Sequence, residues 1–91
     1  MKALSVRITG VVQGVGYRAW AEEAAKARGL SGWVRNRRDG SVEAVIAGPD
    51  DKVSEMLAYF WQGPANSRVE RVEAEPTTPP MQLGFRTLPT A

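Results

Sequence analysis

Residues 4–29, LSVRITGVVQGVGYRAWAEEAAKARG, decide the fold, because three local patterns follow one another there. Apolar and polar residues alternate over 4–9, with the period of two that is typical of a half-buried strand. Glycines interrupt that period over 10–16, and residues 18–28 then form an alanine-rich segment with high helix propensity. The stretch therefore predicts a strand that passes through a glycine-rich loop into the start of a helix.

The predicted helix has one narrow apolar face. Glu22 and Lys26 are spaced to pair across one turn, which supports helix formation. Gly29 follows at the position where a glycine commonly ends a helix. The apolar stripe consists of Tyr17, Ala21, Ala24 and Ala25.

Residues 30–37 and 42–47 predict the two strands of a β-hairpin. They flank residues 38–41, in which the Asp39-Gly40 pair is one of the strongest short-range turn signals.

A second helix is predicted from Asp50 onward, because the helix dipole favours acidic residues in a first turn. Apolar residues then recur with helical spacing up to Gly63-Pro64, which ends the segment. Those apolar positions are Val53, Met56, Leu57 and Phe60.

Two strands are predicted beyond the second helix. Residues 68–75 give the weaker pattern, since Val69 and Val72 fall on opposite faces of a regular strand. We therefore expect either an edge strand or a bulge there. A last short strand is predicted to present one face made by Leu83, Phe85 and Thr87.

This order of elements predicts an α+β fold. It is a ferredoxin-like βαββαβ sandwich, with two helices on one face of a four- to five-stranded antiparallel sheet. We expect residues 1–91 to form a single domain.

The composition excludes several classes of chemistry. The 91 residues include neither cysteine nor histidine, which removes disulfides, thiolate metal sites, cysteine nucleophiles and the commonest general base. The net charge of +2 suits an anionic small ligand but falls short of the basic patch of a dedicated nucleic-acid binder.

Because the apolar runs are short and no signal-peptide pattern is present, we expect a cytoplasmic protein. We also expect a monomer that binds neither nucleic acid nor a membrane.

The glycine-rich loop is suited to hold an anion. Glycines allow successive main-chain N–H groups to converge, and the start of the helix adds a partial positive charge. Arg18, just inside the helix, adds a planar fork that matches two phosphate oxygens. The alternative from the residues alone is a tight crossover in which the glycines permit close packing and Arg18 is solvated.

Asn36 is the second candidate residue, since strand propensity disfavours asparagine late in the first hairpin strand. Proximity to the turn is the alternative reason for its presence. Together, Arg18 and Asn36 would supply a phosphate clamp and a carboxamide that orients a water molecule.

Without a histidine or cysteine nucleophile, water would attack phosphorus directly, which works best when the leaving group is a stable anion. A carboxylate is such an anion, so the sequence favours a mixed anhydride over a simple phosphate ester.

Several motifs in register resemble the acylphosphatase family. They are G-V-V-Q-G-V-G-Y-R at 10–18, A-x-x-x-G-L at 25–30, G-W-V-R-N at 32–36, D-G-S-V-E at 39–43, Gly48-Pro49 and Ser67-Arg68. Each motif alone is weak, but together they cover nearly the whole chain in order. Tyr17 stands where phenylalanine is usual, and residues 86–91 run past the short aromatic-ended strand common in the family.

The resemblance implies an enzyme that hydrolyses acyl phosphates to a carboxylate and inorganic phosphate. By position, it implies that Arg18 binds the phosphoryl group and that Asn36 orients the attacking water. It also implies that main-chain N–H groups of the loop bind the phosphoryl group, with no metal or cofactor. The phosphate-binding residues would be Gln13, Gly14, Val15, Gly16, Tyr17 and Arg18.

Three other interpretations share this fold. An RNA-binding module is disfavoured because residues 41–47 lack the aromatic side chains that such modules place on their central strands. A carbamoyl-phosphate-handling domain, as found at the start of larger hydrogenase-maturation proteins, would need zinc-binding cysteines and a large downstream portion. The third is a phosphate-binding module without catalysis, which the presence of both Arg18 and Asn36 disfavours.

Overall fold

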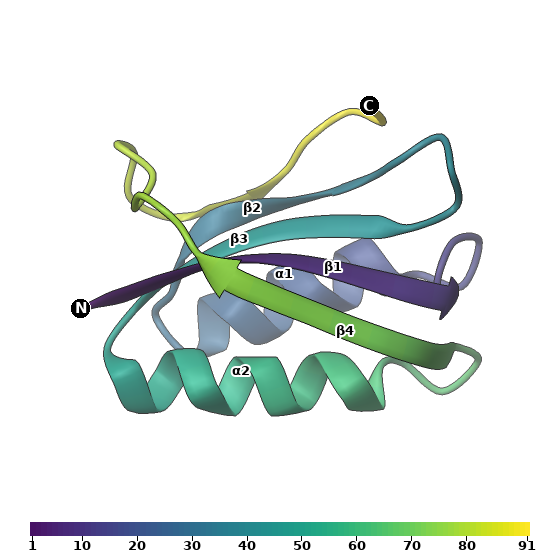
Figure 1. Cartoon of the computed structure of the whole chain (residues 1–91), viewed down its shortest axis with the longest axis horizontal. Coiled ribbons are helices and arrows are strands. Elements are labelled where there is room, and N and C mark those ends of the chain that lie inside the picture. The colour runs from purple at the N-terminus through teal and green to yellow at the C-terminus, as the bar shows by residue number, and fades with distance from the viewer.

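The computed structural model describes residues 1–91 and contains five strands and two helices. In chain order they are β1 (Lys2–Val11), α1 (Tyr17–Ala27), β2 (Ser31–Asn36), β3 (Val42–Gly48), α2 (Asp50–Gln62), β4 (Arg68–Pro76) and β5 (Phe85–Thr87). Both helices lie on the same face of the sheet, as Figure 1 shows. The predicted order of the elements is confirmed.

The sheet has the strand order β4-β1-β3-β2-β5. Its four longer strands pair antiparallel, as expected for the ferredoxin-like α+β fold. The short strand departs from the antiparallel expectation, because β5 runs parallel to β2 and makes the sheet mixed.

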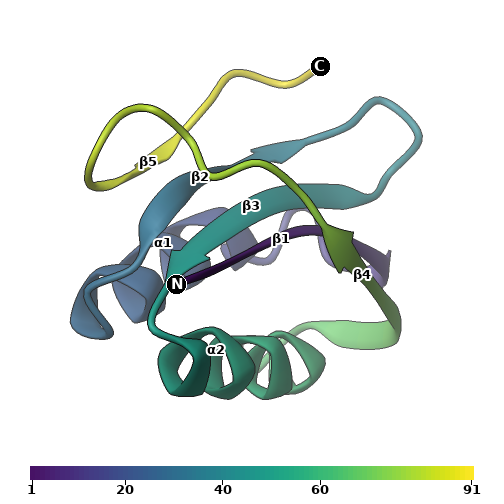
Figure 2. The same cartoon turned by 60° about the vertical axis from the view of Figure 1, so that its left-hand side comes forward.

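The route of the chain explains the parallel pairing. β4 ends beside Leu4 of β1, at the end of the sheet where β2 begins. Residues 77–84 then cross to the opposite edge, where Phe85 lies beside Gly32 (Figure 2). A strand that starts where β2 starts runs in the same direction as β2. Leu83, predicted on the face of the last strand, lies in the crossing loop instead and is 92% exposed.

The chain continues along β2 beyond the end of β5. The N–H of Leu88 donates to the carbonyl oxygen of Val34 at 2.9 Å, and the N–H of Ala91 donates to that of Asn36 at 3.0 Å. Residues 86–91 therefore lie against the edge of β2 and hold its main chain next to the candidate residue Asn36.

β4 is an edge strand and also carries a bulge, so both expectations for this segment are confirmed. Its pairing with β1 shifts by one residue between Thr9 and Gly10, which leaves Glu70 as the extra residue. The extra residue allows Val69 and Val72 to pack against the core from the same side.

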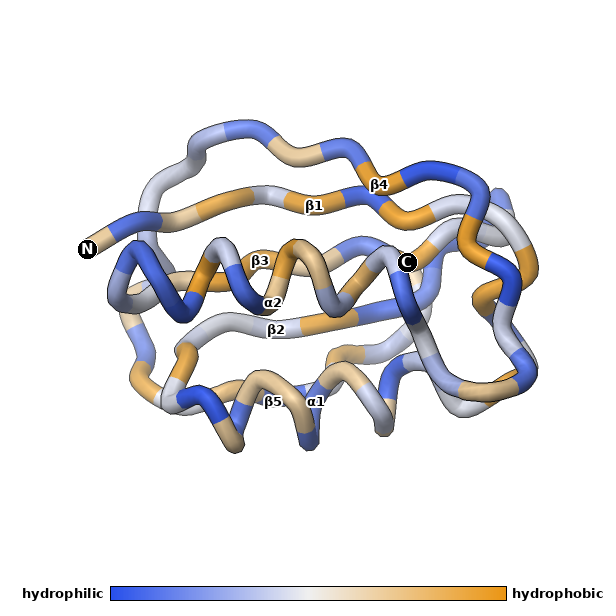
Figure 3. Tube along the Cα trace, turned by 90° about the horizontal axis from the view of Figure 1, so that it is seen from below, coloured by the Kyte–Doolittle hydropathy of each residue, from blue (hydrophilic) through white to orange (hydrophobic).

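The core lies between the helices and the sheet, and Figure 3 shows hydrophobic segments in β1, which runs beside α2 in this view, and in β3, which passes behind α2. The predicted apolar stripe of α1 is buried, as are Val53, Met56 and Phe60 of α2. The hydroxyl of Tyr17 donates to the carbonyl oxygen of Phe60 at 2.7 Å. Burial raises the pKa of Tyr17, so this hydroxyl stays protonated and joins the start of α1 to the end of α2. Neither helix is long and apolar enough to cross a membrane.

Candidate functional site

A cavity of about 390 Å³ lies where the glycine-rich loop, the start of α1, the end of β2 and β5 meet. Residues of the loop and of α1 line it from one side, and Asn36 and Thr87 line it from the sheet. The predicted site residues that border it are Gln13, Gly14, Gly16, Tyr17, Arg18 and Asn36.

The main chain of the loop offers unused hydrogen-bond donors to this cavity. Gly14 and Gly16 have φ angles of 76° and 77°, in the left-handed region that glycine adopts without strain. Gly16 is also the N-cap of α1. None of the main-chain N–H groups of residues 14–19 donates to another main-chain group. Free N–H groups beside the positive end of a helix are a combination that binds anions.

Arg18 is the one cation that lines the cavity. Glu22 lies one turn further along α1, but its carboxylate accepts a hydrogen bond from Thr87 Oγ1 at 2.8 Å and pairs with Lys26 Nζ at 3.2 Å. Arg18 forms no ion pair. Arg18 is half-buried, and its guanidinium is therefore free to bind an anion in the cavity.

Asn36 faces the helix layer because side chains alternate along a strand. Val34, two residues earlier in β2, is fully buried on that face. The main chain of Asn36 is fixed on both sides, by pairing with Val42 of β3 and by the N–H of Ala91. Its side-chain Oδ1 is buried and accepts no hydrogen bond. Asn36 thus borders the cavity from a fixed main chain and has a side-chain oxygen with no donor within the protein.

The side chain of Gln13 joins the loop to the hairpin. Its Nε2 donates to the carbonyl oxygen of Arg37 at 2.7 Å and to that of Ser41 at 2.8 Å. Arg37 directly follows Asn36 in the chain. These two bonds hold the loop in a fixed position relative to Asn36, a contact that sequence analysis missed because it predicted only a main-chain role for Gln13.

Replacing Gln13 with alanine is expected to loosen the loop and lower both stability and activity. The carbonyl oxygens of Arg37 and Ser41 each lose the Gln13 donor and keep one main-chain N–H donor. At about 0.5–1.5 kcal/mol for each lost hydrogen bond, we expect the free energy of unfolding to fall by about 1–3 kcal/mol. Urea unfolding measures that loss, and Gln62→Ala, at an exposed position at the end of α2, is the matched control. Unchanged stability of the Gln13 variant would show that these bonds do not anchor the loop.

The side chains of two predicted loop residues pack against the core or within it. Val15 does not border the cavity and packs, partly buried, against the core. Tyr17 borders the cavity, but its ring is buried in the core. The possible contribution of these residues to an anion site is thus limited to their main chain.

Glu22 and Thr87 border the cavity although they were not among the predicted site residues. A signal for Glu22 was present, because a residue four positions after Arg18 lies on the same face of a helix. No local signal existed for Thr87, whose place depends on the pairing of β5 with the far edge of the sheet.

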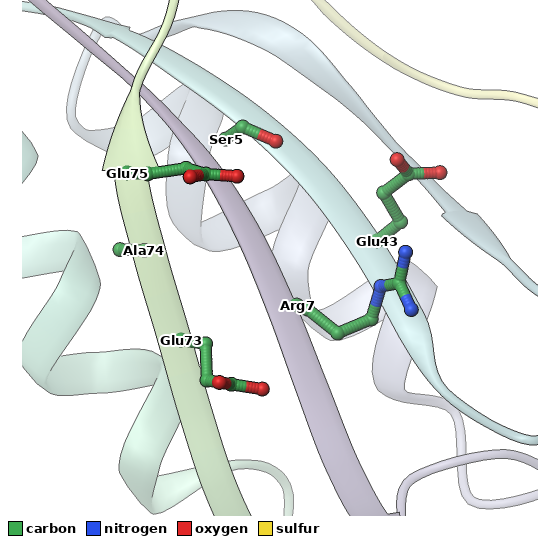
Figure 4. Close-up of a pocket in the computed structure, with 6 residues that line it drawn as sticks. All are labelled: Ser5, Arg7, Glu43, Glu73, Ala74 and Glu75. Atoms are coloured by element: carbon green, nitrogen blue, oxygen red, sulfur yellow. The ribbon is translucent and has the colours of Figure 1, made fainter.

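A second hollow, of about 330 Å³, lies over three neighbouring strands, β4, β1 and β3. Figure 4 shows Glu43, Glu73 and Glu75 around it, with Arg7 as its only cation. The excess of carboxylates repels an anion, so the cavity beside Arg18 is the better anion site. The chain contains no group of three or more histidine, cysteine, aspartate or glutamate side chains arranged to hold a metal ion.

Comparisons with known proteins place this chain among acylphosphatases. The acylphosphatase family model matches residues 4–87. An acylphosphatase of Azorhizobium caulinodans is 54% identical over 88 residues, which cover 96% of this chain and 95% of that protein. The structure of an acylphosphatase from Coxiella burnetii matches with a TM-score of 0.92 at 31% identity, covering 96% of this chain and 92% of the other.

A structure of full-length HypF in a phosphate- and nucleotide-bound form also matches, with a TM-score of 0.85 at 21% identity. The match covers 98% of this chain but 12% of HypF, and it shows a shared fold alone.

Proposed function

This chain is an enzyme of the acylphosphatase family, and we propose that it hydrolyses the carboxyl-phosphate bond of acyl phosphates in the cavity beside Arg18. The products are a carboxylate and inorganic phosphate. The observation that carries the proposal is the unpaired guanidinium of Arg18 next to successive main-chain N–H groups that have no main-chain acceptor.

The phosphoryl group is held by the loop and by Arg18. The N–H groups of residues 14–17 bind its oxygens at the positive end of α1. The guanidinium of Arg18 supplies two parallel N–H donors to two further oxygen lone pairs. Because these donors are fixed before the substrate arrives, they stabilise the charge that develops on the phosphoryl oxygens in the transition state.

Water attacks phosphorus directly, with Asn36 as the orienting residue. Asn36 borders the cavity and its Oδ1 has no donor within the protein, so the carboxamide accepts a hydrogen bond from the attacking water when it turns toward the cavity. The new bond forms between the water oxygen and phosphorus. The bond from phosphorus to the carboxyl oxygen breaks, and its electron pair leaves with the carboxylate. Both protons of the water end on the phosphate product.

The leaving group explains how this chemistry proceeds without a strong base or a covalent intermediate. The chain has no histidine or cysteine that could be phosphorylated. A carboxylate leaves as a stable anion, so holding and orienting the reactants accelerates the loose transition state sufficiently. We further propose that the reaction needs no metal ion.

Hydrolysis of benzoyl phosphate by the purified protein in the presence of EDTA tests this proposal, with p-nitrophenyl phosphate as the comparison. We expect rapid hydrolysis of the acyl phosphate and little of the ester. If the folded protein binds inorganic phosphate but leaves benzoyl phosphate intact, it is a binding module without catalysis. Comparable rates on both substrates would contradict the role given to the carboxylate leaving group.

A further inference from the structure

The cavity has two charged side chains, and they lie at different points along it. Arg18 is in the first turn of α1, and Glu22 lies one turn on, about 6 Å further along the helix axis. On the sheet side, Asn36 is at the end of β2, whereas Thr87 lies beside Val34, two residues earlier. The cavity therefore runs from a cationic end at Arg18 to an anionic end at Glu22.

The carboxylate of Glu22 is charged and held in place. The hydrogen bond from Thr87, and then that from Lys26, lower the pKa of Glu22, so it is ionised at neutral pH. These two partners bind different oxygens of the carboxylate, Oε1 and Oε2. The side chain is 31% exposed, so it meets both the cavity and solvent.

We propose that Glu22 determines which acyl groups the enzyme accepts, by disfavouring acyl groups that carry a negative charge of their own. This inference rests on the proposed function. When the loop and Arg18 hold the phosphoryl group, the acyl group extends along the remaining cavity toward Glu22. A second carboxylate or phosphate on the acyl group would then face a fixed negative charge, whereas a neutral or cationic group would not.

No other charge inside the cavity offsets that of Glu22. Lys26 pairs with Glu22 but does not border the cavity, and it is 59% exposed. Arg86 is next to Thr87 in β5, so its side chain points to the open face of the sheet. Arg18 is already bound to the phosphoryl group. An anionic acyl group therefore has no cation to contact at the far end of the cavity.

The test compares the hydrolysis of 4-methylbenzoyl, 4-carboxybenzoyl and 4-(trimethylammonio)benzoyl phosphate, which are similar in size and differ in charge. For the wild type, we expect kcat/KM of the carboxylate substrate to be depressed by roughly 3- to 10-fold at low ionic strength, relative to the Glu22→Gln variant. The difference between the wild type and Glu22→Gln on the carboxylate substrate is expected mainly in KM. It should diminish as salt is added, because Glu22 is partly exposed. Comparing variants on the same substrates cancels the intrinsic reactivity of each compound.

Three variants separate charge from shape. Glu22→Gln removes the charge and keeps an oxygen that can accept from Thr87. Thr87→Val keeps the charge and removes the hydrogen bond, so discrimination against the carboxylate substrate is expected to persist. Glu23→Gln is the matched control, because it removes the same charge from a residue that borders the groove beside Trp20 and Arg28 instead of the cavity.

Several outcomes would overturn the inference. One is that the wild type and Glu22→Gln discriminate equally against the carboxylate substrate. Another is that Glu23→Gln raises kcat/KM for that substrate as much as Glu22→Gln does. The third is that Thr87→Val no longer discriminates against the carboxylate substrate. Absence of turnover of all three substrates by the folded wild type would instead overturn the proposed function, so the two failures are distinguishable.

Discussion

Replacing Arg18 with alanine is expected to lower kcat/KM for benzoyl phosphate by about 10³- to 10⁵-fold, the range observed for arginines that stabilise phosphoryl-transfer transition states. Arg18 is the only cation that borders the cavity, and no carboxylate competes for it. Inorganic phosphate, measured as a competitive inhibitor, is expected to bind much more weakly as well. The reason is that Arg18 contacts the phosphoryl oxygens in the bound state as well as in the transition state.

Two further variants make this result specific. Arg71→Ala removes an exposed arginine of the edge strand β4 that forms no ion pair, and we expect normal activity and phosphate binding. Arg18→Lys keeps a positive charge but lacks the planar fork, so an intermediate activity is expected. A folded Arg18→Ala protein with turnover within about tenfold of the wild type would fall far outside the range expected for such an arginine and would rule out the phosphate clamp.

Asn36→Ala is expected to lower kcat by about 10²- to 10³-fold, the cost typical of losing one preorganised polar contact to reacting atoms. The inhibition constant of inorganic phosphate should change little, because Asn36 acts on the water and not on the phosphoryl group. Steady-state kinetics with phosphate as the inhibitor measures both quantities. Asn66→Ala, in the exposed loop before β4, is the matched control.

The stability of the Asn36 variant gives a second readout. The side chain of Asn36 makes no hydrogen bond within the protein, so its removal is expected to leave Tm nearly unchanged. Lost activity with preserved Tm would separate catalysis from folding. If phosphate binding weakened in parallel with kcat, Asn36 would instead belong to the groups that hold the phosphoryl group.

The elements of this fold were predictable where the pattern that forms them is local. The burial of Tyr17 and the three alanines of α1 follows from the helical period, and the structure confirms it. The mismatch between Val69 and Val72 predicted an irregular edge, and β4 is an edge strand with a bulge. In both cases the decisive residues lie within a few positions of one another.

The final strand was less predictable because its direction depends on a long crossing loop. No residue in 83–87 specifies which edge of the sheet the segment reaches or in which direction it runs. The loop uses residues up to Gly84 to reach β2, so Leu83 remains exposed and only Phe85 of the predicted face is buried. The approach of Thr87 to the cavity depends on the same pairing.

The candidate site was likewise predictable where its residues are close in sequence and less so where they come from separate elements. The glycine-rich loop and Arg18 are close in sequence, so an anion site could be proposed from them alone. Asn36 lies in a different element, and its pairing with Arg18 was proposed from the chemistry of the two side chains and from the family resemblance, because no local pattern places them together. The structure brings both to one cavity. The side-chain bonds of Gln13 and the position of Glu22 depend on how helix, loop and hairpin pack, which no local pattern specifies.

Hydrolysis of benzoyl phosphate in ¹⁸O-labelled water tests most directly whether water attacks phosphorus in this cavity. The proposed reaction predicts that the label enters inorganic phosphate and that the benzoate remains unlabelled, as measured by mass spectrometry of both products. Label in the benzoate would place the attack at the carbonyl carbon and would contradict the roles given to Arg18 and Asn36.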